Sequence, residues 1–225
     1  MPRPALSEQS IEEQRERTLV AAFKLFTERG LEAVSLRAIA GEVGLSAMAL
    51  YRYFPGGKGE VLATLRGRGF EDLAARFDAS LAGHADPVDR ILALVVTLLR
   101  FALEDPALYR LLFDVTQEEE YGAYLASRRA RAWGVAAGAF VEAIEAGLLR
   151  GDPELLPHLV FAALHGVISF ELSMQPHPNR RHCRTAAPML ELVLRGAGAR
   201  PPFLRKLHKA LADPRLWSKL ERNSS

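Results

Sequence analysis

The chain has 225 residues, of which 49% are apolar and 25% are charged, a composition typical of a soluble globular protein with a substantial core. The formal net charge of +2 is too small to indicate a nucleic-acid partner by itself, and a single cysteine excludes an intrachain disulfide. Because the N-terminus lacks the apolar stretch of a signal peptide and the longest apolar run, ILALVVTLL, is too short to span a bilayer, we expect a cytoplasmic protein with no membrane partner.

Helical periodicity dominates the sequence, and no segment has the pattern of a strand, so we predict an all-α fold. Apolar residues repeat three or four positions apart from Leu19 onward and stop before Gly30, which predicts a first helix over about residues 10–29. A second, short helix should begin after Ser35, whose hydroxyl can accept from free N–H groups, and end at Gly44.

Ser46 is the predicted cap of a third helix, which Pro55-Gly56-Gly57 ends. A helix, a glycine-containing turn and a second short helix form a helix-turn-helix, whose second helix can enter the major groove of DNA. Three of its residues are predicted to face inward: Leu50, Tyr53 and Phe54. Four others then face outward: Ala47, Met48, Tyr51 and Arg52.

The outward face suits DNA chemically. Ala47 and Met48 can touch a thymine methyl group, and the Tyr51 hydroxyl can bind a phosphate. Arg52 can donate two bonds to guanine, although a contact to phosphate alone is the alternative. Arg37, in the first turn of the preceding helix, is a second candidate for a base or phosphate contact.

Local charge also favours DNA. No acidic residue occurs between Val43 and Gly59, and Lys58 stands at the start of the next helix. Its ammonium and the free N–H groups of that helix could share one phosphate. The alternative is a three-helix core with surface tyrosines and no DNA function, because this geometry also occurs in proteins that do not bind DNA.

The rest of the chain is also predicted to be helical. The expected helices cover about residues 58–81, 87–103, 106–115, 118–149, 153–174 and 185–195. From Gly196 the chain forms a basic tail, in which Phe203, Leu207 and Leu211 could lie on one face of a short helix with Trp217 as a further anchor. We expect this tail to dock, the alternative being a frayed terminus.

The segment from Ala21 to Leu62, AAFKLFTERGLEAVSLRAIAGEVGLSAMALYRYFPGGKGEVL, resembles the TetR/AcrR family of bacterial transcriptional regulators. It has the family's aromatic first helix with LF and a following glycine, then the SLRAIAGEVG and S–LY-x-YF patterns, then a lysine. Two later segments, DPALYRLLFD and FAALHGVISFELS, resemble a subgroup with a W-H-G-like signature, in which Leu164 stands here for the tryptophan.

The resemblance implies an N-terminal three-helix DNA-binding domain and a larger C-terminal domain that senses a ligand and dimerises. We place the first at residues 8–57, the second at 58–196 and the basic tail at 197–225. It also implies a homodimer on a double-stranded, palindromic operator. The residues that we assign to the DNA interface are Ser35, Arg37, Ser46, Ala47, Met48, Ala49, Tyr51, Arg52, Tyr53 and Lys58.

Two features depart from the family pattern. The usual YF-x-x-K is here YFPGGK, one residue longer, which shifts Lys58. The Thr or Ser that often precedes LY is Ala49, which removes a hydroxyl contact. Operator specificity therefore cannot be transferred from better-known relatives.

Aromatic residues of the C-terminal half could line an apolar ligand site, because such sites are mostly apolar with a few polar groups. Our candidates for binding a small-molecule effector are Phe101, Tyr109, Phe113, Trp133, Phe161 and His165. His165 either points into a ligand cavity or is satisfied in a contact between helices.

No metal or cofactor is predicted, since His177, His182 and Cys183 lack the paired spacing of a zinc site. The sequence contains no nucleophile elbow, P-loop or dinucleotide fingerprint, so we do not expect an enzyme. A ligand-responsive repressor is therefore the first hypothesis, and a helical protein-interaction adaptor without DNA binding is the alternative.

Overall fold

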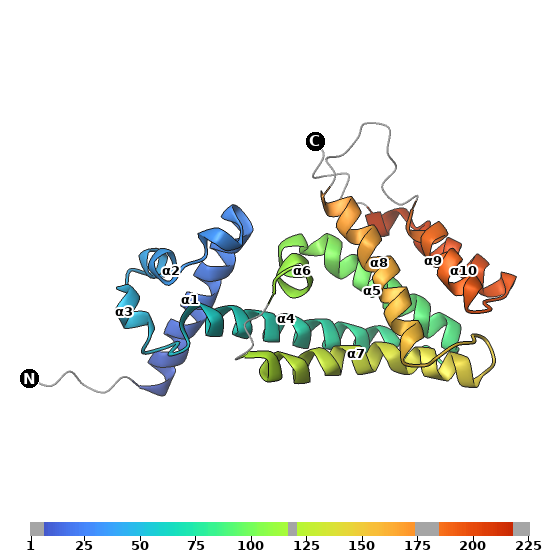
Figure 1. The fold of residues 1–225 in the computed structure, drawn as a ribbon, viewed down its shortest axis with the longest axis horizontal. Helices are drawn as coiled ribbons and strands as arrows, with labels where there is room; N and C mark the ends of the chain where they lie inside the picture. The colour runs from blue at the N-terminus through green and yellow to red at the C-terminus, as the bar shows by residue number, and fades with distance from the viewer. Residues whose placement is uncertain (1–6, 117–120, 174–184, 218–225) are drawn as a thin grey trace, which may run out of the picture. The chain divides into compact units, whose positions relative to one another are not determined.

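The computed structural model describes residues 7–116, 121–173 and 185–217, which form helices and no strand (Figure 1). The chain divides into two compact units. We call residues 1–70 and 110–129 the N-terminal unit, and residues 71–109 and 130–225 the C-terminal unit. The loop with His177, His182 and Cys183 lies outside the described residues.

Three predictions made from the local sequence are confirmed in the N-terminal unit: the helix caps Ser35 and Ser46, and the end of a helix at Gly44. Its elements are α1 Glu8–Arg29, η1 Leu31–Ala33, α2 Leu36–Val43, α3 Ala47–Leu50 and the first part of α4 Gly57–Leu81. Ser35 Oγ accepts from the Ala38 amide at 3.2 Å, and Ser46 Oγ accepts from the Ala49 amide at 3.1 Å. Gly44 ends α2 with a φ of 71°, in the left-handed region that glycine adopts readily.

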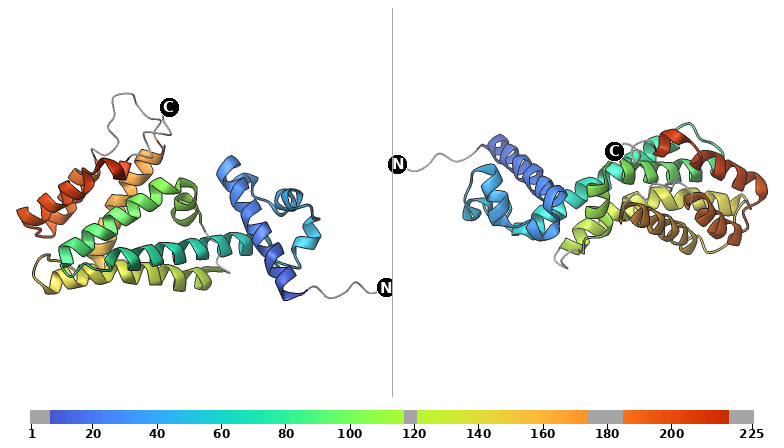
Figure 2. Two further views of the ribbon diagram at one scale, coloured as in Figure 1. Left: turned by 180° about the vertical axis from the view of Figure 1, so that it is seen from behind. Right: turned by 90° about the horizontal axis from the view of Figure 1, so that it is seen from above.

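The other helices are α5 Pro87–Glu104, α6 Pro106–Phe113, α7 Gly122–Glu145, α8 Leu155–Ser173, α9 Ala186–Gly196 and α10 Pro201–Leu211 (Figure 2). Helices α4, α6 and α7 contribute residues to both units. The domain boundary expected after residue 57 therefore differs from the observed division at residue 70, because α4 runs on without a linker.

The core of the N-terminal unit is apolar and closely packed. Leu19 and Leu25 of α1, Ile39 of α2, and Leu50 and Phe54 are each at most 1% exposed. Burial of these side chains is the main force that holds α1, α2 and α3 together, since each is too short or too polar to be stable alone.

The basic tail packs on the C-terminal unit through α10, which contacts α5 and α9. Its buried side consists of Phe203, Leu204, Leu207 and Leu211. Lys206 Nζ lies 2.7 Å from Asp89 Oδ1 of α5. Hydrogen bonds from Arg195 and then from His208 hold the pKa of Glu191 below its ordinary value. The contact between His208 and Glu191 joins α10 to α9. Trp217 is 5% exposed, and its Nε1–H donates to Leu211 O at 2.9 Å.

Helix α8 is apolar on nearly every side. Among the described residues it alone is long and apolar enough to cross a membrane, a test of length and composition that core helices of soluble proteins also pass. The sequence predicted a helix here, but the search for an uninterrupted apolar run overlooked its overall hydropathy, because His158, His165 and Ser169 interrupt the run without adding charge. One face of α8 is buried, and another leaves Leu155, Leu159 and Phe170 exposed.

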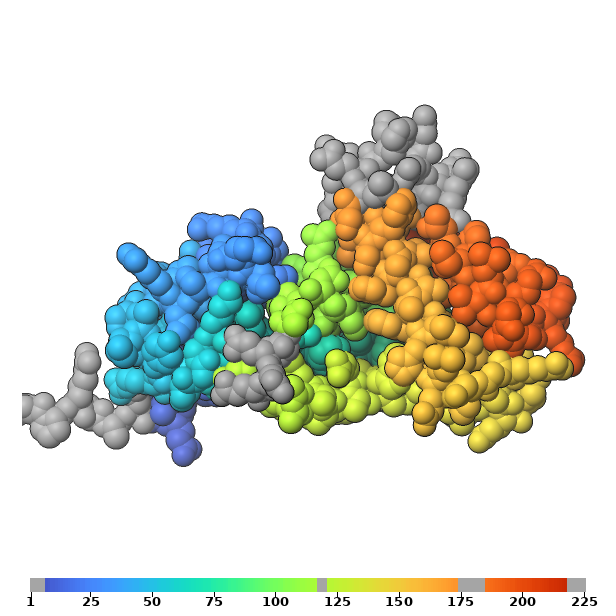
Figure 3. All heavy atoms as spheres, in the orientation of Figure 1, coloured from blue at the N-terminus to red at the C-terminus, as the bar shows by residue number. Residues whose placement is uncertain are grey.

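Helix α9 lies beside α8 (Figure 3) and also carries exposed apolar side chains. Met189 is 43% exposed and Leu192 is 70% exposed. We call the exposed residues Leu155, Leu159, Phe170, Met189 and Leu192 the α8–α9 face. Such a face is more apolar than a solvated helix pair needs to be, which indicates an interaction site.

Candidate nucleic-acid interface

The second helix of the helix-turn-helix is shorter than its sequence pattern suggests. The regular helix α3 ends at Leu50, and the chain continues to Phe54 as tight turns, with the Arg52 amide on Ala49 O at 3.3 Å. Pro55 prevents helical backbone from continuing through Phe54, because a proline disfavours helical backbone at the residue before it. We call residues 47–54 the α3 segment.

Opposite sides of the α3 segment have opposite character. Leu50 and Phe54 are fully buried, whereas Met48 is 77% exposed and Tyr51 is 46% exposed. Arg52 is also exposed. Three of the four residues predicted to face outward therefore lie on the surface of the N-terminal unit, while Ala47 is half-buried. Of the three predicted to face inward, Tyr53 is only half-buried.

The other assigned positions border this face. Arg37 is exposed in the first turn of α2, while Ala47, Ala49 and Tyr53 are half-buried. The hydroxyls of Ser35 and Ser46 cap their helices as acceptors. Each hydroxyl keeps its proton, which it could still donate to a phosphate oxygen.

Lys58 has a structural contact that the sequence did not predict. Its Nζ lies 3.2 Å from the carbonyl oxygen of Leu31, in the turn that follows α1, and its side chain is half-buried. An ammonium has three donors, so this bond leaves donors for a phosphate. Lys58 thus ties α4 to η1 in addition to any role with DNA.

Both glycines of the YFPGGK sequence occupy positions where a larger residue would be strained or crowded. Gly57 has a φ of 64°, which favours glycine. A Cβ atom on Gly56 would lie 1.7 Å from the Tyr121 hydroxyl, which donates to Gly56 O at 3.3 Å, so the tip of the tyrosine side chain would have to move away. The side chain of Tyr121, the residue just before α7, therefore packs on the turn that follows the α3 segment.

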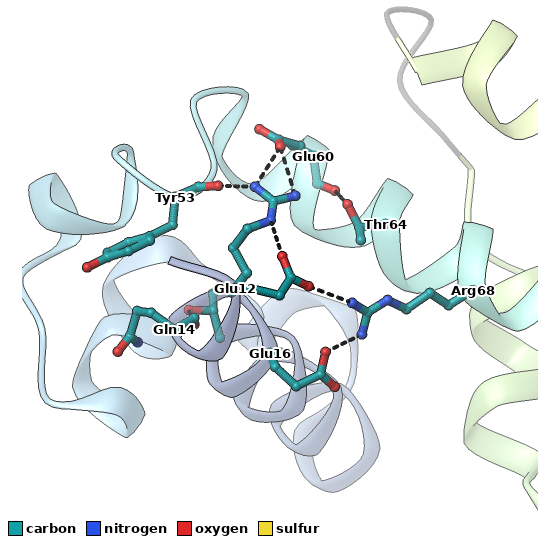
Figure 4. Close-up of polar contacts among 9 residues, drawn as sticks. Glu12, Gln14, Glu16, Tyr53, Glu60, Thr64 and Arg68 are labelled. Atoms are coloured by element: carbon teal, nitrogen blue, oxygen red, sulfur yellow. Dashed lines mark hydrogen bonds and ion pairs between the residues drawn. The ribbon is translucent and has the colours of Figure 1, made fainter. Parts of the chain in front are cut away.

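A polar network holds the same turn from the side of α1. Figure 4 shows Tyr53, Glu60 and Glu12 converging on one guanidinium, and Arg68 reaching Glu12 and Glu16. The guanidinium is that of Arg15, which donates to Tyr53 O and lies 3.4 Å from Glu60 Oε1. Sequence reasoning missed Arg15 and Glu60, because partners 45 positions apart leave no local signal.

The C-terminal unit contains a cluster of four of the six predicted ligand residues. The Tyr109 hydroxyl and His165 Nδ1 are 2.7 Å apart, and the Phe161 and His165 rings stack with centroids at 5.7 Å. Trp133 meets Phe161 edge to face at 6.0 Å. The ring of His158, which we did not assign, lies tilted against Trp133 with the ring centroids 4.0 Å apart.

Two ligand candidates have other surroundings. Phe101 is 1% exposed and lies beneath the Arg76 guanidinium at 5.3 Å. Phe113 falls in the N-terminal unit, where its ring packs edge to face on Phe70 at 5.8 Å. Both positions satisfy packing within their own units. The contact of His165 with Tyr109 matches the alternative of a satisfied histidine between helices.

The sequence matches two family descriptions. Residues 19–65 match "Bacterial regulatory proteins, tetR family", and residues 91–195 match "Tetracyclin repressor-like, C-terminal domain". The first range includes the α3 segment, and the second includes the segments DPALYRLLFD and FAALHGVISFELS.

Curated relatives resemble part of the chain. The nucleoid occlusion factor SlmA of Haemophilus influenzae (strain PittGG) is 34% identical over 110 residues, 48% of this chain and 50% of that protein. The transcriptional repressor KstR of Mycobacterium tuberculosis (strain H37Rv) is 34% identical over 103 residues, 46% of each protein. The chain thus spans about half the length of the curated relatives that it matches.

A solved structure resembles most of the chain. The TetR-family transcriptional regulator PfmR from Thermus thermophilus is 27% identical, with a TM-score of 0.62. The match covers 80% of this chain and 97% of PfmR.

Proposed function

The chain belongs to the TetR family of bacterial regulatory proteins, and we propose that it represses transcription by binding a palindromic DNA operator as a homodimer. The observation that carries this proposal is the free, acid-free outer side of the α3 segment, with Met48, Tyr51 and Arg52 exposed. Repression is proposed because KstR carries that name. KstR and PfmR are named as transcriptional regulators and SlmA as a nucleoid occlusion factor, and none of the three is named as an enzyme. A cytoplasmic location is proposed with this role.

Each outer residue has a distinct proposed task. Arg52 reads guanine in the major groove, Met48 contacts a thymine methyl group, and Tyr51 binds a phosphate. Arg37 and Lys58 add phosphate contacts at the two sides. Charge at these positions rather than the net charge of +2 supplies the attraction.

The α8–α9 face supports the homodimer. A two-fold interface uses the same patch on both chains, and two such faces would form a bundle of four helices. The exposed apolar residues of α8 and α9 would then leave water, which supplies the driving force.

We further propose that a small apolar organic effector binds at the aromatic cluster of Tyr109, Trp133, Phe161 and His165. Aromatic rings with a few polar atoms are typical of sites for small organic ligands. The effector must bind the DNA-free form more tightly than the DNA-bound form, since only differential affinity can shift the equilibrium. A compound screen by thermal shift, repeated with Trp133→Ala, tests this site because a bound ligand raises the melting temperature.

A salt series with random duplex DNA tests DNA binding against the adaptor alternative. A DNA-binding protein loses affinity steeply as salt rises, because each phosphate contact releases counterions. We expect a linear fall of log K with log salt concentration. Absence of duplex binding at low salt would instead favour a protein-interaction adaptor.

A further inference from the structure

Three parts of the N-terminal unit meet at Arg15 of α1. Its guanidinium donates to the carbonyl of Tyr53 and lies 3.4 Å from Glu60 Oε1 (Figure 4). It also covers the Phe54 ring, 4.2 Å from the ring centroid. The Arg15 and Glu60 side chains are only 27% and 24% exposed. A guanidinium is planar and rigid, so contacts at its edge and its face fix one orientation.

The Tyr53 carbonyl stands near the end of the α3 segment, in the tight turns that follow the regular helix. Phe54 O accepts from the Gly57 amide at 2.9 Å, whereas Tyr53 O accepts from Arg15. Arg15 therefore holds the carbonyl group of Tyr53, the residue that directly follows Arg52.

Glu60 connects Arg15 to the turn that follows the α3 segment. While its Oε1 faces Arg15, its Oε2 accepts from the Gly56 amide at 2.9 Å. One arginine and one carboxylate thus connect α1, the end of the α3 segment, the turn and the first turns of α4. Positions 53, 54 and 56 are all held from behind the exposed face.

We propose that Arg15, acting with Glu60, is a positioning residue for sequence readout: it sets the pose of the α3 segment on DNA and thereby the selectivity between base sequences. Arg15 does so without reading a base, since its guanidinium is engaged by Tyr53, Phe54 and Glu60. This inference rests on the proposed function, because selectivity presupposes DNA binding.

The expected effect is on selectivity rather than on general affinity. Base contacts such as that of Arg52 require alignment of donors with one base edge. Phosphate contacts are the same for every sequence and tolerate a small tilt of the helix better. Loss of Arg15 should therefore weaken binding to a preferred duplex and leave binding to other duplexes nearly unchanged.

Arg68 provides a matched control. It is also an arginine that joins α1 to α4, through ion pairs to Glu12 at 3.7 Å and to Glu16. Both of these carboxylates lie in α1, so Arg68 supports the packing of α1 on α4 without holding the turn. If Arg15 were only a brace between these helices, the two variants would behave alike.

The experiment uses the full chain and a duplex that the unaltered chain selects from a random pool, with a scrambled duplex of equal composition. We define selectivity as the dissociation constant for the scrambled duplex divided by that for the selected duplex. For Arg15→Met we expect this selectivity to fall about tenfold, which is within the discrimination that one base-edge contact supplies. Binding to the scrambled duplex should change less than about twofold, because phosphate contacts persist. Arg68→Met should keep the selectivity of the unaltered chain.

Two conservative variants keep the test decisive if Arg15→Met folds poorly. Arg15→Lys keeps the charge but not the planar fork, and Glu60→Gln keeps an acceptor for the Gly56 amide but not the charge. Each should lose part of the selectivity. Unchanged selectivity in both variants, or an equal loss in Arg68→Met, would overturn the positioning role.

Amide hydrogen exchange without DNA separates this inference from the proposed function. Arg15→Met should accelerate exchange in residues 51–57, and Arg68→Met should not, because only Arg15 holds that backbone. If the unaltered chain selects no duplex, the proposed function fails, while this exchange result still decides whether Arg15 holds the α3 segment. Equal exchange in both variants would refute the hold itself.

Discussion

Replacement of Leu192 by glutamate tests the proposed dimer at its most exposed apolar residue. Leu192 of α9 is 70% exposed. Full burial of a leucine side chain contributes about 1.5–3 kcal/mol, so covering the exposed part contributes about 1–2 kcal/mol per chain. Because a two-fold interface contains the residue twice, the loss is about 2–4 kcal/mol per dimer.

This loss corresponds to a rise of roughly 30- to 700-fold in the dimer dissociation constant. Burial of two carboxylates would add to the effect. Glutamate is a good helix former, so α9 itself should remain folded. Sedimentation over a concentration series measures the constant directly, with the melting temperature as a check on folding.

Val20→Glu is the matched control, because Val20 of α1 is 61% exposed and lies in the N-terminal unit. It should leave the dimer unchanged. The reasoning is refuted if Leu192→Glu associates as tightly as the unaltered chain, or if the unaltered chain is a monomer at micromolar concentration.

Three further predictions concern DNA readout, the turn and the tail. Arg52→Ala should relax base preference at one position per half-site, whereas Lys58→Ala should weaken binding to all sequences alike and lower the salt slope by about one unit. Binding to an operator library measures both effects. An unchanged base preference in Arg52→Ala would mean that this residue binds only phosphate. Gly56→Ala should destabilise the chain by about 0.5–1.5 kcal/mol, because the Tyr121 hydroxyl must move away and loses its bond to Gly56 O. This cost should disappear in a Tyr121→Ala background, and additive effects in urea unfolding would contradict this contact. Trp217→Phe should lower the free energy of unfolding by about 1–3 kcal/mol, and with it the melting temperature, because Leu211 O loses its buried donor. An unchanged melting temperature would mean that this contact of the tail contributes nothing to stability.

Local signals in the sequence were sufficient for the helix-turn-helix. Ser35, Ser46 and Gly44 act within a few residues of their own positions, so their roles at the helix ends are readable without the fold. The alternation of Leu50 and Phe54 with Met48 and Tyr51 likewise predicted the buried and exposed sides.

Contacts between distant segments could not be predicted in this way. Lys58 meets Leu31, and Tyr121 meets Gly56, only because packing brings separate elements together. The glycines of the YFPGGK sequence were a visible departure, but their cause, a tyrosine 65 positions away, was not. In the C-terminal unit, aromatic residues predicted a cluster, while the fold decided that Phe101 and Phe113 pack elsewhere.

Selection of duplexes from a random-sequence pool by the full chain tests the central claim most directly. The proposed regulator should enrich one motif with two inverted half-sites, because a two-fold dimer presents two α3 segments to DNA. Binding to that motif should exceed binding to scrambled duplexes by at least about a thousandfold at physiological salt. Repeated rounds that enrich no motif would contradict the claim that the α3 segment reads a DNA sequence.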